Sequence, residues 1–122
     1  MIKTVLTIDD SRTMRDMLML ALKDAGYRVV QAEDGVHGLE VLIAQDRPDV
    51  IVTDINMPRM DGYGFIEGVR ANPEFRTVPI LVLTTESSPE KKMRARDAGA
   101  TGWIVKPFNP DTLVEAIRRV AA

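Results

Sequence analysis

The sequence predicts an α/β fold in which five parallel strands form one sheet between two layers of helices. Short runs of β-branched and apolar residues alternate five times with longer segments of helical period. Several runs are apolar at successive positions, as in strands that a parallel sheet buries on both faces. The length of 122 residues suits one compact unit, so we expect a single domain over residues 1–122. Such βα alternation favours a doubly wound sandwich with right-handed crossovers.

The five candidate strands are residues 5–8, 27–30, 50–53, 80–83 and 103–105. Between them, apolar residues recur at the i, i+3, i+4, i+7 spacing of a helix that faces a core. In the first helix this stripe runs from Met14 to Ala25 and includes Met17, and Gly26 ends it. The second helix spans residues 36–44 and includes Ile43 on its apolar face, the third follows Gly62, and the last runs through residues 113–120.

The fourth helix differs from the others because most of its residues are charged. Ser88 is a suitable N-cap, Pro89 a suitable first helical residue, and Gly99 a suitable stop. Its apolar anchors are Met93 and two alanines. We therefore expect this helix to be weakly held.

Composition excludes several classes of protein. Apolar residues make up 45% and charged residues 28% of the chain, as in ordinary globular proteins. The net charge of -2 does not suggest binding to nucleic acid or to an anionic membrane. Cysteine is absent and His37 is the single histidine, which excludes disulfides, thiolate chemistry and multi-histidine metal sites. With neither a signal-peptide pattern nor a long apolar span, we expect a cytoplasmic protein.

Polar residues follow four of the candidate strands. Asp9 and Asp10 follow the first, Asp54 the third, Thr84 the fourth and Lys106 the fifth. In a parallel sheet these residues reach the same edge, where ligands bind in doubly wound folds. Clustered carboxylates suit Mg²⁺, while a lysine and a threonine suit phosphoryl oxygens. The pattern indicates phosphoryl chemistry.

Within this set, Asp54 is the candidate nucleophile, because a carboxylate can attack phosphorus and form an acyl phosphate. Taken singly, each residue has a simpler interpretation. Asp9 and Asp10 could cap a helix, Asp54 could be a solvated loop acid, and Lys106 a surface lysine. The combination favours the functional interpretation.

These residues resemble the receiver domain of two-component response regulators, most closely the single-domain chemotaxis regulators of the CheY type. The matching motifs are IDDS at residues 8–11, TDINMP at 53–58, MDG at 60–62, LTTE at 83–86, GA at 99–100 and VKPF at 105–108. The resemblance implies a flavodoxin-like (βα)5 sandwich with strand order 2-1-3-4-5. It also implies a stand-alone regulator that is a switch and not an enzyme.

The resemblance implies that Asp54 accepts a phosphoryl group from a chemotaxis-type histidine kinase. It implies Mg²⁺ as cofactor, with Asp10, Asp54 and the main-chain carbonyl of Asn56 as ligands and Asp9 acting through water. The side chains of Asn56 and Glu86 would modulate dephosphorylation.

By the same resemblance, Thr84 would hydrogen-bond the phosphoryl oxygens and Lys106 would pair with them, placed by a cis Lys106–Pro107 peptide. Thr84 and Trp103 would form the switch that reshapes the face of the fourth helix, fifth strand and fifth helix. On general grounds alone, a tryptophan such as Trp103 is more often core filler than a switch, and the resemblance favours the switch. The implied partners are a flagellar motor switch protein and a phosphatase, and we expect a monomer.

Three alternatives remain open. The chain could be a phosphate sink or phosphorelay intermediate that does not bind the motor. It could be an aspartyl-nucleophile phosphohydrolase, although that class has a second acid where this chain has Asn56. It could also be a receiver-like protein that binds its partner constitutively.

Overall fold

A computed structural model describes residues 2–121, and its centre is one parallel sheet. The five strands lie in the order β2-β1-β3-β4-β5 and every neighbouring pair is parallel. This confirms the predicted fold class and strand order. The strands are β1 (Thr4–Ile8), β2 (Arg28–Ala32), β3 (Val50–Thr53), β4 (Ile80–Thr84) and β5 (Gly102–Val105).

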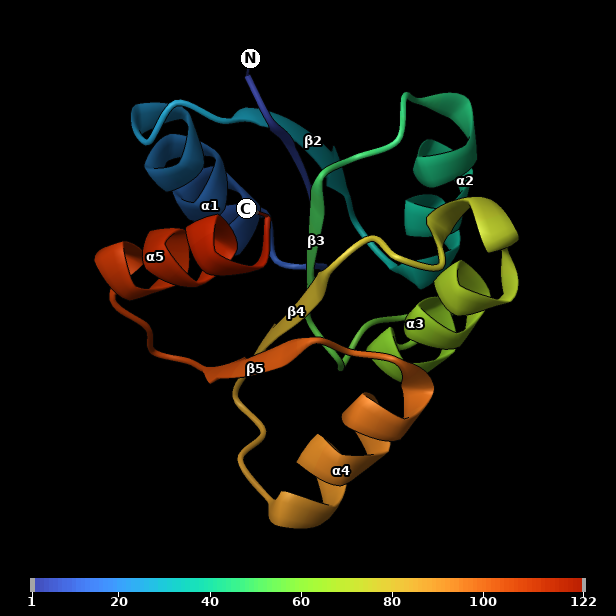
Figure 1. Ribbon diagram of the computed structural model, residues 1–122. Helices are drawn as coiled ribbons and strands as arrows, with labels where there is room; N and C mark the ends of the chain where they lie inside the picture. The colour runs from blue at the N-terminus through green and yellow to red at the C-terminus, as the bar shows by residue number, and fades with distance from the viewer. Residues whose placement is uncertain (1, 122) are drawn as a thin grey trace.

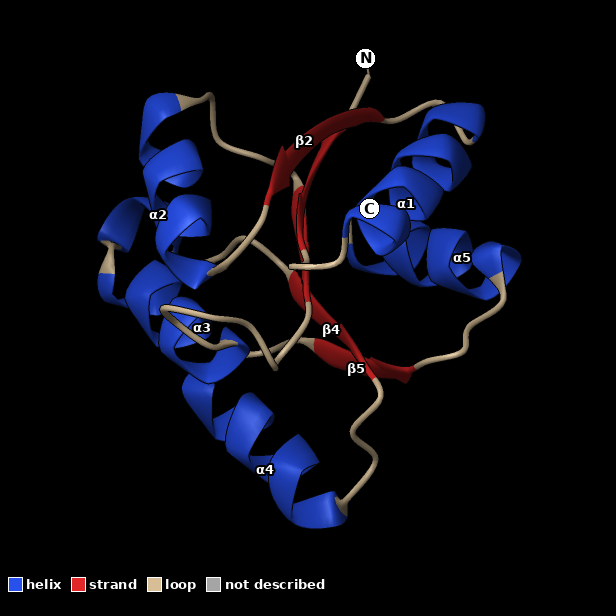
Figure 2. Cartoon of the chain, turned by 180° about the vertical axis from the view of Figure 1, so that it is seen from behind, coloured by secondary structure: helices blue, strands red, loops and turns tan. Residues whose placement is uncertain are grey.

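Helices cover both faces of the sheet. Figure 1 shows α1 and α5 together on one side, α2 and α3 on the other, and α4 beside α3 at the β5 end. Figure 2 shows the same layers from behind. The helices are α1 (Arg12–Asp24), α2 (Gly35–Ala44), α3 (Gly62–Ala71), α4 (Pro89–Ala98) and α5 (Pro110–Val120), with a short 3₁₀ helix at Pro73–Phe75 that the sequence did not predict. None of the helices within residues 2–121 has the length and apolarity that a membrane span requires.

Each α-helix begins at a capping side chain. An oxygen of the capping residue accepts a hydrogen bond from a backbone N–H two or three positions later, which satisfies one of the free donors of the first turn. The N-caps are Ser11, Asp34, Asp61, Ser88 and Asn109. The predicted start of α4 at Ser88 and its stop at Gly99, which has a φ of 119°, are confirmed.

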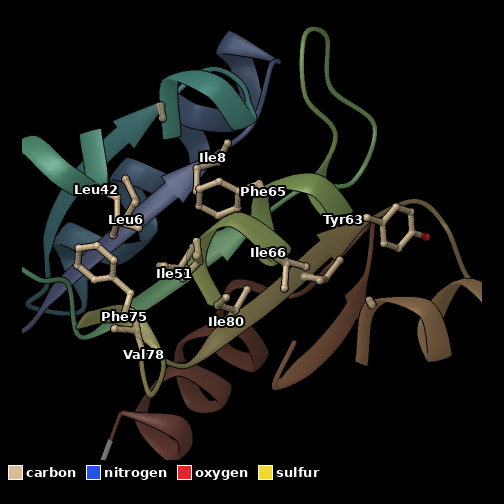
Figure 3. Packing of buried hydrophobic residues seen from close by; sticks show 14 of the residues in the cluster. Leu6, Ile8, Leu42, Ile51, Tyr63, Phe65, Ile66, Phe75, Val78 and Ile80 are labelled. Atoms are coloured by element: carbon tan, nitrogen blue, oxygen red, sulfur yellow. The ribbon is translucent and has the colours of Figure 1, made fainter. Parts of the chain in front are cut away.

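The two faces of the sheet have separate cores. On the α2 and α3 side, Phe65 packs with Leu6, Ile51 and other fully buried residues, as Figure 3 shows. On the α1 and α5 side, Leu22 and Ile117 belong to a second cluster. Full burial of such a side chain stabilises the fold by about 1.5–3 kcal/mol. These cores hold the strands, and therefore the residues at the strand ends, in place.

Some boundaries and core positions differ from the prediction. β2 begins at Arg28, one residue late, because the Tyr27 N–H donates to the Leu22 carbonyl at the end of α1. Met17, Ile43 and Met93 were expected to face the core, yet all three are exposed. Met17 and Ile43 stand one position from the buried Leu18 and Leu42, about 100° round the helix, and Met93 stands two positions from the buried Ala95, about 200° round α4.

α4 buries Ala95, packs the half-buried Ala98 against the same core, and makes its other contacts through charged side chains. Arg70 of α3 donates to the Gly99 carbonyl at the end of α4, with N–O distances of 2.9 and 3.0 Å. The guanidinium of Arg94 lies 4.0 Å from the centre of the Tyr63 ring. Polar contacts of this kind hold a helix less firmly than an apolar face does, as the sequence predicted for this helix.

Candidate functional site

The predicted site residues meet at the carboxyl edge of the sheet because the strands are in register there. Ile8 of β1 is paired with Thr53 of β3, so Asp9 and Asp54 leave the sheet side by side. The Asp54 N–H donates to the Ile8 carbonyl at 3.0 Å. On the other side, the Lys106 N–H donates to the Thr84 carbonyl at 2.7 Å. The sheet ladder thus fixes the backbone of these residues.

Three carboxylates gather at this edge. Asp9, Asp10 and Asp54 each offer one oxygen, and these oxygens lie within 4.8 Å of one another. Asp9 is buried, Asp54 is half-buried and Asp10 is exposed. A donor set made only of oxygen, open to solvent on one side, fits Mg²⁺, which keeps several waters when it binds protein.

Lys106 stands between two of these acids. Its ammonium lies 2.9 Å from Asp9 Oδ2 and 3.1 Å from Asp54 Oδ2, and its side chain is 11% exposed. The Lys106–Pro107 peptide bond is cis. We call Asp9, Asp54 and Lys106 the inner group.

The inner group shows opposing electrostatic effects. Burial raises the pKa of Asp9 above its ordinary value, although the hydrogen bond from Lys106 partly offsets this. Burial alone would lower the pKa of Lys106, but its bonds to Asp9 and Asp54 outweigh burial and the pKa is raised. Lys106 is therefore a firmly charged ammonium held by oxygens that a metal ion would also use.

The Asp54 carboxylate has a defined orientation. The Ile55 N–H donates to its Oδ1 at 2.7 Å, and Oδ2 faces Lys106. The main chain here approaches α3 closely, since a Cβ on Gly62 would lie 2.3 Å from the Asp54 carbonyl oxygen. Only glycine permits that approach, and the Gly62 N–H uses it to donate to the Ile55 carbonyl at 2.7 Å.

A second set of polar residues lies beside the inner group, in the loops. The Asn56 side chain donates to Glu86 Oε1 at 3.3 Å, and Lys91 of α4 lies 2.8 Å from Glu86 Oε2. We call Asn56, Glu86 and Lys91 the outer bridge. Lys91 first, and then Asn56, lowers the pKa of Glu86 by bonding to its charged form. The outer bridge links the loop after β3 to the first turn of α4.

Thr84 and Trp103 both reach the outer bridge through the backbone of Glu86. The buried Thr84 hydroxyl accepts from the Glu86 N–H at 3.3 Å, and the Trp103 indole donates to the Glu86 carbonyl at 3.0 Å. The indole is half-buried against the core on the α3 side. Thr84 and Trp103 are thus connected through one residue, Glu86, to which both are hydrogen-bonded.

The structure brings Asp9, Asp10, Asp54 and Lys106 into one cluster, while Asn56, Thr84 and Trp103 are joined to one another through Glu86. It also adds Lys91, which pairs with Glu86. From the sequence, Lys91 was only one of the many charged residues of the fourth helix. The available signal was its position five residues after Glu86, just inside a helix whose N-cap had been identified as Ser88. The arrangement provides an oriented carboxylate, a cluster of three acids that could hold a metal ion, an ammonium and a hydroxyl.

Comparisons with known proteins show to which family the chain is related. The family model described as the response regulator receiver domain matches residues 5–118. The chemotaxis protein CheY1 of Helicobacter pylori (strain J99) is 40% identical over 117 residues, covering 95% of this chain and 94% of that protein. The sensor histidine kinase CheAY of Helicobacter pylori (strain 26695) is 38% identical over 116 residues, covering 94% of this chain but 14% of that protein. The solved structure of CheY4 of Vibrio cholerae superposes with a TM-score of 0.93 at 47% identity, covering 98% of this chain and 99% of that one.

Proposed function

The chain belongs to the response regulator receiver domain family, and from this premise we propose that it is a signalling switch phosphorylated on Asp54. The observation that carries the proposal is the Asp54 carboxylate, oriented by the Ile55 N–H and facing Lys106 beside two further acids. The phosphoryl group would come from a phosphohistidine of a histidine kinase of the chemotaxis type.

In this reaction an oxygen of Asp54 attacks phosphorus, an O–P bond forms, and the P–N bond to the donor imidazole breaks. The departing imidazole nitrogen retains the bonding electron pair and takes up a proton. Lys106 pairs with the phosphoryl oxygens in place of the carboxylates, and the Thr84 hydroxyl donates to one of them. Phosphoryl transfer depends on this kind of positioning and charge stabilisation.

Mg²⁺ is the cofactor that the donor set fits, and Asp9, Asp10, Asp54 and the carbonyl of Asn56 would hold it. When bound, it would neutralise negative charge on the transferred group. Lys106 already neutralises part of the carboxylate charge, and this keeps three acids together in the protein without metal.

The output would pass through Glu86. Thr84 accepts from the N–H of that residue, and the Trp103 indole donates to its carbonyl. A movement of the Thr84 hydroxyl toward a phosphoryl group would therefore displace Glu86 and weaken the hydrogen bond that holds the indole. The face formed by α4, β5 and α5 would then change its affinity for a partner. By similarity to the chemotaxis proteins, that partner is a flagellar motor switch protein, and a phosphatase would reset the switch.

Intact mass spectrometry tests the chemistry. Incubation with Mg²⁺ and phosphoramidate is expected to add one phosphoryl group per wild-type chain. No addition is expected with EDTA or in Asp54→Asn. Repeated turnover of a small phosphomonoester would instead support a phosphohydrolase.

Binding of a labelled motor switch peptide tests the output. A gain in affinity on phosphorylation supports the switch, whereas phosphorylation without any gain supports a phosphate sink. Equal and strong binding in both states would indicate a constitutive binding module.

A further inference from the structure

The loop between β3 and α3 carries a strained residue at its tip. Arg59 has a φ of 65°, and within residues 2–121 it is the one non-glycine residue with a positive φ. An arginine in this left-handed region costs free energy that other contacts must offset. The same loop contains Asp54 at its start and Asn56 two residues later.

The contacts that hold Arg59 come from the loop before α2. Its guanidinium donates to both oxygens of Asp34, with N–O distances of 2.8 and 3.0 Å. The Asp34 side chain is 4% exposed and that of Arg59 is 53% exposed. The Asp34 carboxylate also caps α2 by accepting from the His37 N–H at 2.8 Å. Arg59 is therefore fixed to a buried acid that is itself part of a helix N-terminus.

A backbone contact lies beside this ion pair. The Gly35 N–H donates to the Met60 carbonyl at 3.2 Å, and a Cβ on Gly35 would lie 2.7 Å from that oxygen. Two successive residues at the start of α2, the N-cap Asp34 and Gly35, thus hold two successive residues of the loop after β3, Arg59 and Met60. The loop tip is attached at two points.

The other end of the loop is attached at the inner group, where the Ile55 N–H donates to Asp54 and the Gly62 N–H donates to the Ile55 carbonyl. The segment between these anchors is short and includes Asn56. Residues that hold a metal ligand in place through its neighbours affect metal affinity without touching the metal.

We propose that Arg59 and Asp34 form a positioning pair that fixes the loop after β3, so that Asp54 and the Asn56 carbonyl are set for Mg²⁺ before it binds. This inference rests on the proposed function. Neither residue contacts the reacting atoms. Their effect is on the affinity for Mg²⁺ and not on the rate of phosphoryl transfer once the metal is bound.

Calorimetric titration of the full chain with MgCl₂ tests the pair. Arg59→Gly removes the guanidinium and also relieves the left-handed strain, while Asp34→Asn keeps a capping oxygen and removes the charge. Each variant is expected to weaken Mg²⁺ binding by about tenfold. The double variant should be no weaker than either single one, because both lose the same contact.

Four controls separate positioning from general stability. Arg119→Ala breaks the exposed pair with Glu115 on α5, which spans 3.2 Å, and should leave Mg²⁺ binding unchanged. Arg59→Lys should recover part of the affinity. Phosphorylation by phosphoramidate at saturating Mg²⁺ should proceed at the wild-type rate in every variant, and urea denaturation in EDTA should show each one folded.

If Arg59→Gly bound Mg²⁺ with an affinity within about twofold of wild type, the inference would be overturned. A free-energy difference that small is what the loss of an ordinary surface ion pair produces. Additive losses in the double variant would also overturn it. If wild-type protein failed to bind Mg²⁺ or to be phosphorylated, the proposed function itself would fail, and this inference with it.

Discussion

The inner group and the outer bridge lie side by side but are held in different ways. Asp9 and Asp54 leave the ends of the central strands β1 and β3, Lys106 leaves the end of the edge strand β5, and main-chain hydrogen bonds at the sheet edge fix the backbone of Asp54 and Lys106. Asn56, Glu86 and Lys91 come from two loops and from α4, and two of them are exposed. If the proposed function holds, the chemistry would depend on residues fixed by the sheet, whereas control of the phosphorylated state would depend on residues held only by side-chain contacts between loops and α4.

The largest expected effect comes from removing the ammonium of the inner group. Lys106→Met should slow phosphorylation of Asp54 by about 100-fold, the cost of losing one charge-stabilising donor. It should also tighten Mg²⁺ binding, because no ammonium competes for Asp9 and Asp54. Time-resolved intact mass and calorimetry measure the two effects.

Lys92→Met is the matched control for that change, since Lys92 is an exposed lysine of α4. It should leave both quantities unchanged. A Lys106→Met protein that is phosphorylated at the wild-type rate would contradict the role given to the inner group.

The next largest effect is on the backbone beneath Asp54. Gly62→Ala should destabilise the protein by about 1–3 kcal/mol, because the new methyl group would press on the Asp54 carbonyl. Gly64→Ala is the comparison: its nearest neighbour is the flexible side chain of Met60 at 3.1 Å, and alanine favours the helix. Urea denaturation should give Gly64→Ala a clearly higher free energy of unfolding than Gly62→Ala. The reverse order would refute the close approach of Gly62 to the Asp54 carbonyl.

A smaller effect concerns the cost of the buried acid. Because burial raises the pKa of Asp9, the folded protein without metal disfavours its charged form, and Asp9→Asn should be more stable than wild type in EDTA at pH 7. This advantage is full above the folded pKa and disappears as the pH falls below the ordinary value of 3.8.

Urea midpoints in EDTA between pH 3 and 8, spanning the acid range in which carboxylates titrate, measure the advantage. A gain that grew toward low pH would have the wrong sign. The same substitution should weaken Mg²⁺ binding, so the acid is retained for function at a cost in stability.

The smallest expected effect on stability belongs to the outer bridge. Lys91→Ala breaks an exposed pair and should change the free energy of unfolding by less than about 0.5 kcal/mol. Glu86 is then free to move away from Asn56, so water should reach the phosphoryl group more easily. The lifetime of the phosphorylated form should fall by about twofold, which corresponds to a free-energy difference about as small as the change in stability. Lys92→Ala is the control, and an unchanged lifetime in Lys91→Ala would show that the outer bridge has no part in control.

The same contrast explains what the sequence could predict. The inner group and Thr84 were predictable because parallel strands bring their carboxyl ends to one edge, so placing these residues needed only the strand assignment. The family comparison confirms the receiver domain that these motifs predicted.

Contacts between loops could not be predicted in this way. The Arg59–Asp34 pair depends on a left-handed residue, and the Lys91–Glu86 pair depends on how far α4 turns back toward the site. Neither follows from a periodic pattern.

The exposure of Met17 and Ile43 was missed for a related reason. Periodicity predicts that a helix has an apolar stripe, but it does not predict which edge of that stripe the neighbouring elements cover.

The most direct test locates the phosphoryl group itself. Borohydride reduces an aspartyl phosphate to homoserine, so phosphorylated protein can be reduced, digested and mapped by mass spectrometry. Our account predicts homoserine at position 54 alone, dependent on Mg²⁺ and on the phosphodonor. Homoserine at another acid, or none in folded protein that carries a phosphoryl group, would contradict Asp54 as the nucleophile of this site.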